Sequence, residues 1–131
     1  MREQVFSASP FERQYGFCRA MRIGSRIVVA GTAPIPQDGS EPPPGAHDQM
    51  LLCGRIAVDA VVRLGGSVSD VVRTRMFIAS SADSDEIGRA HREVFGETSP
   101  AATMVVVSAL LDPAWNVEIE VEADITAGEA L

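Results

Sequence analysis

The segment Val117–Ile125 constrains the fold more than any other part of this chain. Apolar residues occupy its odd-numbered positions, and acidic residues occupy positions 118, 120, 122 and 124. Because successive side chains of a strand point to opposite faces, this pattern predicts a strand with one face in a core and four carboxylates on the other. The carboxylates repel one another unless cations lie nearby. Arg73 and Arg75, two residues apart in another expected strand, are candidates for cross-strand or cross-subunit pairs.

Two amphipathic helices accompany the strands. Apolar residues spaced by three and four predict a helix over Asp48–Leu64, which Gly65 and Gly66 end. A second helix is expected up to Phe95, with Asp83 and Glu86 in a capping-box spacing. The remaining strands are expected at Phe17–Arg22, Arg26–Gly31, Val71–Ala79 and Ala101–Leu110, the first two joined by a turn at Gly24-Ser25. The order ββαβαββ predicts an α+β sandwich, with two helices on one face of a mixed sheet.

The composition of the chain excludes several classes of function. At 131 residues and 13.9 kDa, the chain is expected to form a single domain, 1–131. A net charge of −7 argues against nucleic acid as a partner. All eleven cationic residues are Arg, which excludes a lysine Schiff base or a P-loop lysine. With neither a signal peptide nor a membrane-length apolar run, and with only two cysteines, the sequence favours a cytoplasmic protein that does not bind a membrane.

Motifs for common reaction types are missing from the sequence. The two histidines and two cysteines lack metal-ligand spacing, and neither a serine-nucleophile motif nor a glycine-rich phosphate loop occurs, so no metal or cofactor is expected. His91 lies on the apolar stripe of the second helix, where packing and one hydrogen bond are the expected role and a site role is the alternative.

Several segments, in order, carry a resemblance to a known family. They are Tyr15-Gly16-Phe17, Ile27–Pro34, Leu64-Gly65-Gly66 followed by Ser69–Thr74, Phe95 with Ser99-Pro100-Ala101-Ala102, and Val117–Ala123. Together, from about Tyr15 to Ile125, they resemble the Rid family of reactive intermediate deaminases, also called the YjgF or L-PSP endoribonuclease family.

The resemblance implies a chorismate-mutase-like subunit. Three subunits would form a homotrimer, with their sheets facing a central barrel and clefts between neighbours. Archetypal members hydrolyse enamine and imine intermediates such as 2-aminoacrylate to 2-keto acids and ammonia. In them an Arg after Pro-Ala binds the substrate carboxylate, a Glu on the last strand positions water, and a Tyr near the N-terminus lines the pocket.

This chain matches the family pattern in part. Tyr15, Gly31 and Glu118 match the tyrosine, the pocket glycine and the water-positioning glutamate, whereas Ala102 stands where the arginine is expected, and Gly88 where an asparagine is usual. The resemblance therefore assigns catalytic roles to Glu118 and Tyr15. The candidate substrate-binding residues are Gly31, Ala102, Phe77, Arg73 and Arg19, and Trp115 is a further candidate to line the cleft.

Each candidate also has a structural interpretation. Glu118 is one of four similar acidic residues, Tyr15, Phe77 and Trp115 are packing aromatics, and Arg19 and Arg73 are members of structural ion pairs. Two functions stay open: hydrolysis of an enamine or imine other than 2-aminoacrylate, or binding of a small metabolite by a trimer without catalysis. An endoribonuclease is the weakest interpretation, given the charge.

Overall fold

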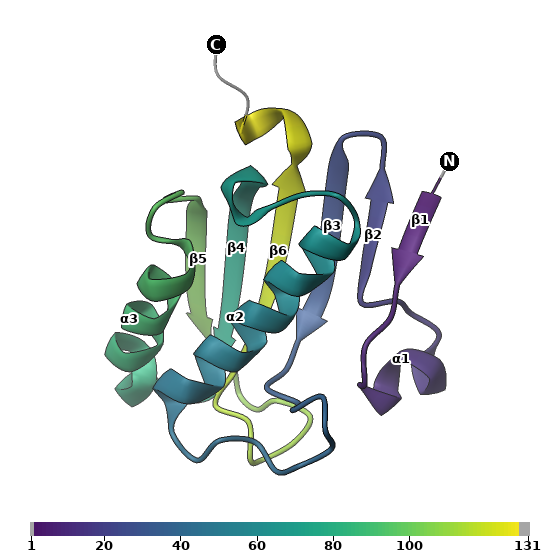
Figure 1. The fold of residues 1–131 in the computed structure, drawn as a ribbon. Helices are drawn as coiled ribbons and strands as arrows, with labels where there is room; N and C mark the ends of the chain where they lie inside the picture. Colours follow the sequence, from purple (N-terminus) through teal and green to yellow (C-terminus); the bar gives the residue numbers. More distant parts are fainter. Residues whose placement is uncertain (1, 129–131) are drawn as a thin grey trace.

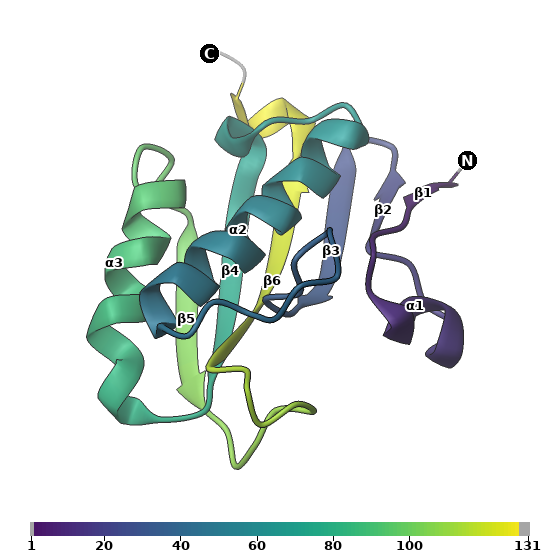
Figure 2. The same cartoon turned by 60° about the horizontal axis from the view of Figure 1, so that its bottom comes forward.

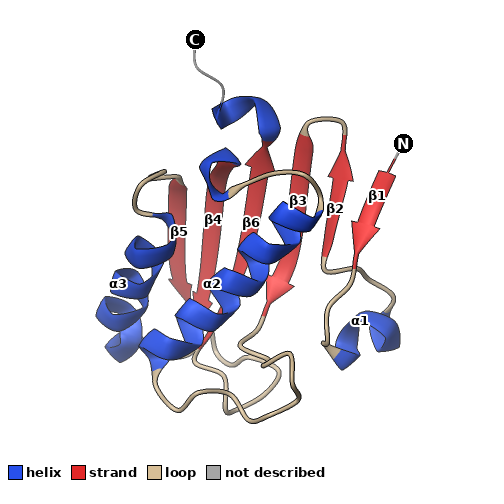
Figure 3. Ribbon diagram, in the orientation of Figure 1, coloured by secondary structure: helices blue, strands red, loops and turns tan. Residues whose placement is uncertain are grey.

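The computed structural model describes residues 2–128, so the outermost residues of the expected domain lie outside it. A six-stranded mixed sheet carries two long helices on one face, and a short third helix lies at one edge of the molecule (Figure 1, Figure 3). The strands are β1 (Arg2–Val5), β2 (Ala20–Ile23), β3 (Arg26–Thr32), β4 (Val71–Ile78), β5 (Ala101–Val106) and β6 (Val117–Asp124). The α-helices are α1 (Pro10–Tyr15), α2 (Ala46–Arg63) and α3 (Ser84–Phe95); short 3-10 turns occur at Val68–Asp70, Ser81–Asp83 and Ile125–Gly128.

The sheet has the strand order β1-β2-β3-β6-β4-β5. Neighbouring strands are antiparallel except β4 and β5, which are parallel because α3 connects them across the helix-covered face. β6, the last strand in the sequence, lies in the middle of the sheet between β3 and β4 (Figure 1). The expected α+β class, with two helices on one face of a mixed sheet, is confirmed.

Alternation along β6 places the core. Val117, Ile119, Val121 and Ala123 are almost fully buried beneath the helices, and the acidic residues between them lie on the opposite face. The buried stripe of α2 packs on this surface through Met50, Cys53, Ala57, Ala60 and Val61. The helix ends where expected, because Gly65 adopts a left-handed φ of 94° that a side chain would strain.

Arginines offset the repulsion along the acidic row. Glu122 accepts contacts from Arg26 at 3.0 Å, Arg75 at 3.1 Å and Arg73 at 3.4 Å, and Arg75 also lies 3.6 Å from Glu120. The pairs made by Arg73 and Arg75 are cross-strand pairs that the sequence predicts. Arg73 is therefore a member of a charge cluster on the open face of the sheet.

The first 15 residues depart from the expected order. β1 adds a strand at the edge, paired antiparallel with β2, and α1 follows it (Figure 2). A four-residue strand and a six-residue helix are too short for periodicity to reveal. β2 begins at Ala20 rather than Phe17, and β5 ends at Val106 rather than Leu110.

The expected capping box at Asp83 is wrong. The Asp83 side chain makes no capping hydrogen bond, and the preceding turn begins instead with Ser80, whose hydroxyl accepts from the Ala82 amide at 3.2 Å. A capping box does occur at Ser67 and Asp70, where the Ser67 amide donates to Asp70 Oδ2 at 2.9 Å. The Asp83 spacing does not produce a capping box because Asp83 itself belongs to the 3-10 turn Ser81–Asp83, which directly precedes α3.

Candidate functional site

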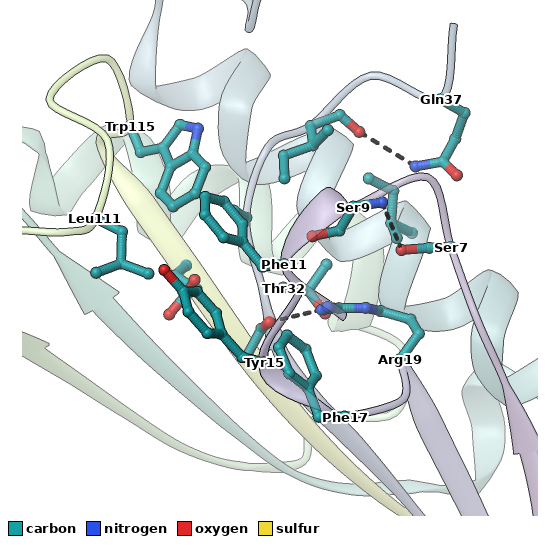
Figure 4. A pocket seen from close by; sticks show the side chains of 15 residues that line it. Ser7, Ser9, Phe11, Tyr15, Phe17, Arg19, Thr32, Gln37, Leu111 and Trp115 are labelled. Atoms are coloured by element: carbon teal, nitrogen blue, oxygen red, sulfur yellow. Dashed lines mark hydrogen bonds between the residues drawn. The ribbon is translucent and has the colours of Figure 1, made fainter. Parts of the chain in front are cut away.

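A pocket of about 80 Å³ lies where α1, the end of β3 and the beginning of β6 meet (Figure 4). Aromatic and aliphatic side chains make most of its wall, and a few polar groups reach it. The apolar lining residues are Phe11, Tyr15, Phe17, Ala33, Ile35, Ile56, Leu111 and Trp115; the others are Ser7, Ser9, Arg19, Gly31, Thr32, Gln37 and Glu118. Mostly apolar pockets with few convergent polar groups are typical small-molecule sites.

Glu118 is a carboxylate in this apolar pocket. The alternation of β6 turns it away from the core, and Phe77 lies directly opposite it on β4. Burial raises the pKa of Glu118 above its ordinary value; the nearby charge of Arg19 opposes this shift, and that of Glu120 adds to it. Gly31 makes room for the carboxylate, because a Cβ at position 31 would lie only 3.1 Å from Glu118 Oε2.

Arg19 lies at the base of the pocket and is almost fully buried. Its Nε donates to Glu12 Oε2 at 2.9 Å, and its Nη1 donates to the Gly31 carbonyl oxygen at 2.6 Å and to Thr32 Oγ1 at 2.9 Å. These bonds connect α1 and β3 to Arg19, the residue immediately before β2. Arg19 therefore positions the backbone at Gly31, beside Glu118.

Glu12 completes this buried network. It accepts from the Ser7 amide at 2.8 Å and from the Ser7 hydroxyl, in addition to Arg19. Burial raises the pKa of Glu12, but the bonds from Ser7 and Arg19 outweigh it, and the pKa lies below its ordinary value. Glu12 is therefore held as a carboxylate, which balances the charge of Arg19.

Four aromatic residues line the pocket (Figure 4). The Phe11 ring stacks against Tyr15 with centroids 5.9 Å apart and meets Trp115 edge-on at the same distance. The Phe17 ring lies 5.6 Å from the Arg19 guanidinium carbon. Tyr15 is 63% exposed and so lies at the rim of the pocket.

The structure brings together some of the expected site residues and separates others. Tyr15, Gly31, Arg19 and Glu118 share the pocket, as does Trp115. The following residues do not line it: Phe77, which is the cross-strand neighbour of Glu118; Arg73, which lies in the charge cluster; and Ala102.

Ala102 lies on the edge strand β5, away from the pocket. It pairs with Thr74 of β4, whose side chain points to the helix-covered face and meets His91 of α3 at 2.7 Å. Because paired residues share a face, Ala102 is on the opposite side of the sheet from Glu118. Within one chain, Ala102 and Glu118 therefore do not line the same pocket.

His91 has the packing role expected of it. Its Nε2 hydrogen-bonds with Thr74 Oγ1, and its ring lies 4.9 Å from that of Phe95. Burial lowers the pKa of His91, which favours the neutral ring.

Phe11, Phe17 and Ser7 are pocket residues that sequence reasoning missed. Phe17 stands within the motif Tyr15-Gly16-Phe17, so its place beside Tyr15 was a usable signal. The other two lie in the segment of β1 and α1, whose fold the sequence did not predict. Within residues 2–128, no group of His, Cys, Asp and Glu is arranged to hold a metal, and no helix is long and apolar enough to cross a membrane.

Comparison with known proteins supports one family. Residues 8–125 match the family model Endoribonuclease L-PSP. An uncharacterized protein of Streptomyces coelicolor is 38% identical over 120 residues, which are 92% of this chain and 90% of that protein. The Mycobacterium tuberculosis protein Rv2704, described as a member of the YjgF/YER057c/UK114 family, is 37% identical with a TM-score of 0.85, covering 95% of this chain and 100% of that one.

A third relative is the Escherichia coli protein TdcF. It is 27% identical over 110 residues, 82% of this chain and 83% of that protein, and carries the name of a reactive intermediate deaminase. The structure of TdcF with bound serine has a TM-score of 0.78 and 26% identity, covering 92% of this chain and 93% of that one. The chain described here belongs to the YjgF, or Rid, family, whose family model is Endoribonuclease L-PSP.

Proposed function

We propose that this protein hydrolyses small enamines and imines to a carbonyl compound and ammonia, with Glu118 as the catalytic residue. The observation that carries the proposal is a carboxylate with a raised pKa in an otherwise apolar pocket, placed against a glycine. The name of the relative TdcF supports the same reaction class.

The reaction needs a group that both gives and takes a proton near neutral pH. Protonated Glu118 donates its proton to the enamine carbon, which leaves an iminium ion beside a carboxylate. The carboxylate then takes a proton from water as the water oxygen bonds to the iminium carbon. Glu118 gives this proton to the nitrogen of the resulting carbinolamine, the C–N bond breaks and ammonia leaves, and the hydroxyl proton returns to Glu118 as the carbonyl forms. A raised pKa suits Glu118 to both steps.

The other pocket residues have supporting roles in this proposal. Gly31 leaves space for the Glu118 carboxylate, and Arg19 holds the Gly31 carbonyl. Tyr15 covers the mouth of the pocket. Ala102 supplies no charge for a substrate carboxylate, so 2-aminoacrylate is not the preferred substrate.

We further propose that the protein is a homotrimer with ligand clefts between subunits. The open face of the sheet carries the ion-paired acidic row and exposed apolar residues such as Val28 and Val105, which a neighbouring subunit would cover. Phe77, on this open face, would then line a cleft that a second chain completes, and Ala102 would border such a cleft from the edge strand β5. Light scattering at micromolar concentration tests this, and a monomer contradicts it.

Carbonyl release from freshly generated imines tests the reaction. We expect release above the uncatalysed rate, lost by at least about a hundredfold in Glu118→Gln. Glu120→Gln is the matched control, since Glu120 lies on the same strand and face but outside the pocket. Ala102→Arg is expected to add activity on 2-aminoacrylate. Equal rates in wild type and Glu118→Gln would refute the proposal.

A second candidate is a trimer that binds a small metabolite without catalysis. Two positions favour it, because Ala102 and Gly88 lack the polar side chains of the family pattern. In that case no imine is turned over, and compounds from a metabolite panel raise the melting temperature of the protein. An endoribonuclease is disfavoured by the net charge of −7.

A further inference from the structure

We infer that the pocket selects small ligands with a positively charged nitrogen and no carboxylate, held between the rings of Phe11, Tyr15 and Trp115 and the carboxylate of Glu118. This inference deepens the proposed function. It rests on the proposed function in one respect, since the bound cation is taken to be the iminium form of the substrate. It names the charge class of the ligand.

The charges lining the pocket support a cationic ligand. Arg19 lines the pocket, but its charge is balanced by Glu12 at 2.9 Å, and its Nη1 is used by Gly31 and Thr32. Among the residues that the structure describes, no side-chain cation lies within 4.0 Å of Glu118. Arg19 acts on Glu118 only from beyond ion-pair distance, so Glu118 contributes the one pocket charge that no ion pair neutralises among the described residues.

The aromatic wall favours the same charge. Phe11 stacks on Tyr15 and meets Trp115 nearly at a right angle, so the three rings form one continuous aromatic wall of the pocket. The faces of aromatic rings attract ammonium groups, and Trp and Tyr do so most strongly. A carboxylate gains nothing from these faces and is repelled by Glu118.

The pocket within one chain has room for a ligand of a few heavy atoms. A space of about 80 Å³ accepts a short alkyl chain with one polar end. Ile35, Ile56 and Leu111 contribute the aliphatic part of the wall, which suits such a chain. A cationic nitrogen on a short apolar chain matches all three properties.

Binding of three matched probes tests the ligand class. Butylammonium, butan-1-ol and butyrate share a four-carbon chain and differ in charge. The quenching of Trp115, the single tryptophan, and calorimetry report binding to the full-length protein. We expect butylammonium to bind at least about tenfold more tightly than butan-1-ol, and butyrate to bind most weakly.

Two variants assign the selectivity to the named groups. Glu118→Gln keeps the shape but removes the charge, and it is expected to reduce the ammonium preference to less than about threefold. Phe11→Leu keeps an apolar side chain and is expected to weaken butylammonium more than butan-1-ol. Glu120→Gln, outside the pocket, is the control that keeps the preference. Similar affinities for ammonium and alcohol, tighter binding of butyrate, or no detectable binding of butylammonium would each overturn the inference.

A pair of imines separates this inference from the proposed function. Butan-1-imine, made by an amine oxidase, and 2-iminobutanoate, made by an amino acid oxidase, differ mainly by a carboxylate. Faster hydrolysis of the first supports both proposals. Faster hydrolysis of the second supports the deaminase and overturns the charge selectivity. Selective binding of butylammonium with no turnover of either imine refutes the proposed reaction and leaves the ligand class supported.

Discussion

Replacement of Arg19 by Met tests whether the buried ion pair holds the pocket together. Arg19 and Glu12 are each 3% exposed, and their side chains meet at 2.9 Å. Arg19→Met keeps most of the side-chain volume but removes the donors to Glu12, Gly31 and Thr32. Glu12 then keeps only its bonds from Ser7.

The size of the effect follows from these contacts. Removal of one partner from a buried pair costs roughly 3–5 kcal/mol, because the other charge stays buried without its partner. A domain of this size has a free energy of unfolding of roughly 5–15 kcal/mol, so the variant is expected to fold with much reduced stability. Glu12→Gln in the Arg19→Met background is expected to restore part of the loss, since it removes the unpaired charge.

The pH dependence has a defined sign. The pKa of Glu12 in the folded protein lies below its ordinary value of 4.5. A lowered pKa stabilises the fold above pH 4.5, and this contribution is lost as pH falls through the lower, folded-state pKa. The difference in stability between wild type and Arg19→Met is therefore expected to be full at pH 7 and to shrink below pH 4.5.

Urea unfolding at one protein concentration measures these differences. Trp115, the single tryptophan, reports on the pocket, and circular dichroism reports on the whole fold. A loss below about 1 kcal/mol in Arg19→Met would refute the reasoning. So would strict additivity of the Glu12 and Arg19 substitutions, because residues in direct contact are expected to be coupled.

Three further predictions concern the pocket and the end of α2. Because burial raises the pKa of Glu118, hydrolysis of an imine, in which the Glu118 carboxylate takes a proton from water, is expected to rise with pH through a pKa above 4.5 in a pH–rate profile. The raised pKa also means that folding favours the protonated carboxyl, so the contribution of Glu118 to stability is full at low pH and is lost as pH rises. Glu118→Gln is therefore expected to stabilise the protein more at pH 8 than at pH 4. The opposite trend in urea titrations would contradict this. Gly31→Ala places a Cβ 3.1 Å from Glu118 Oε2 and is expected to lower activity at least about tenfold with a small change in melting temperature, whereas unchanged activity would show that the contact is not needed. Gly65→Ala forces φ of 94° on a side chain 2.7 Å from Arg22 Nη1, and a loss of roughly 1–2 kcal/mol is expected in thermal unfolding, with no loss counting against the strain.

Periodic segments were predictable because their information is local. The alternation over 117–125 placed one face of β6 in the core, and the spacing of apolar residues in 48–64 identified α2. Gly24-Ser25 identified the turn between β2 and β3. The arginine pairs with the acidic row also followed, since Arg73 and Arg75 lie two residues apart in a strand.

The site was predicted in part. Glu118, Gly31 and Tyr15 came from the resemblance, and the structure places them in one pocket. Phe11 and Ser7 were missed because they belong to elements too short to show a period. The strand β1 is held by its pairing with β2, and α1 by the bond of Glu12 to Arg19, and both depend on distant partners.

By itself, the sequence determined the class of fold, the faces of its longest elements and the family pattern with alanine at position 102. Only the tertiary structure decided that Arg19 is neutralised by Glu12, that Phe11 and Trp115 meet, and that Ala102 lies across the sheet from Glu118. The physical reason is the range of the interactions. Periodicity depends on neighbours within one or two turns, whereas a pocket forms where segments up to about a hundred residues apart pack together, and no local pattern records their register.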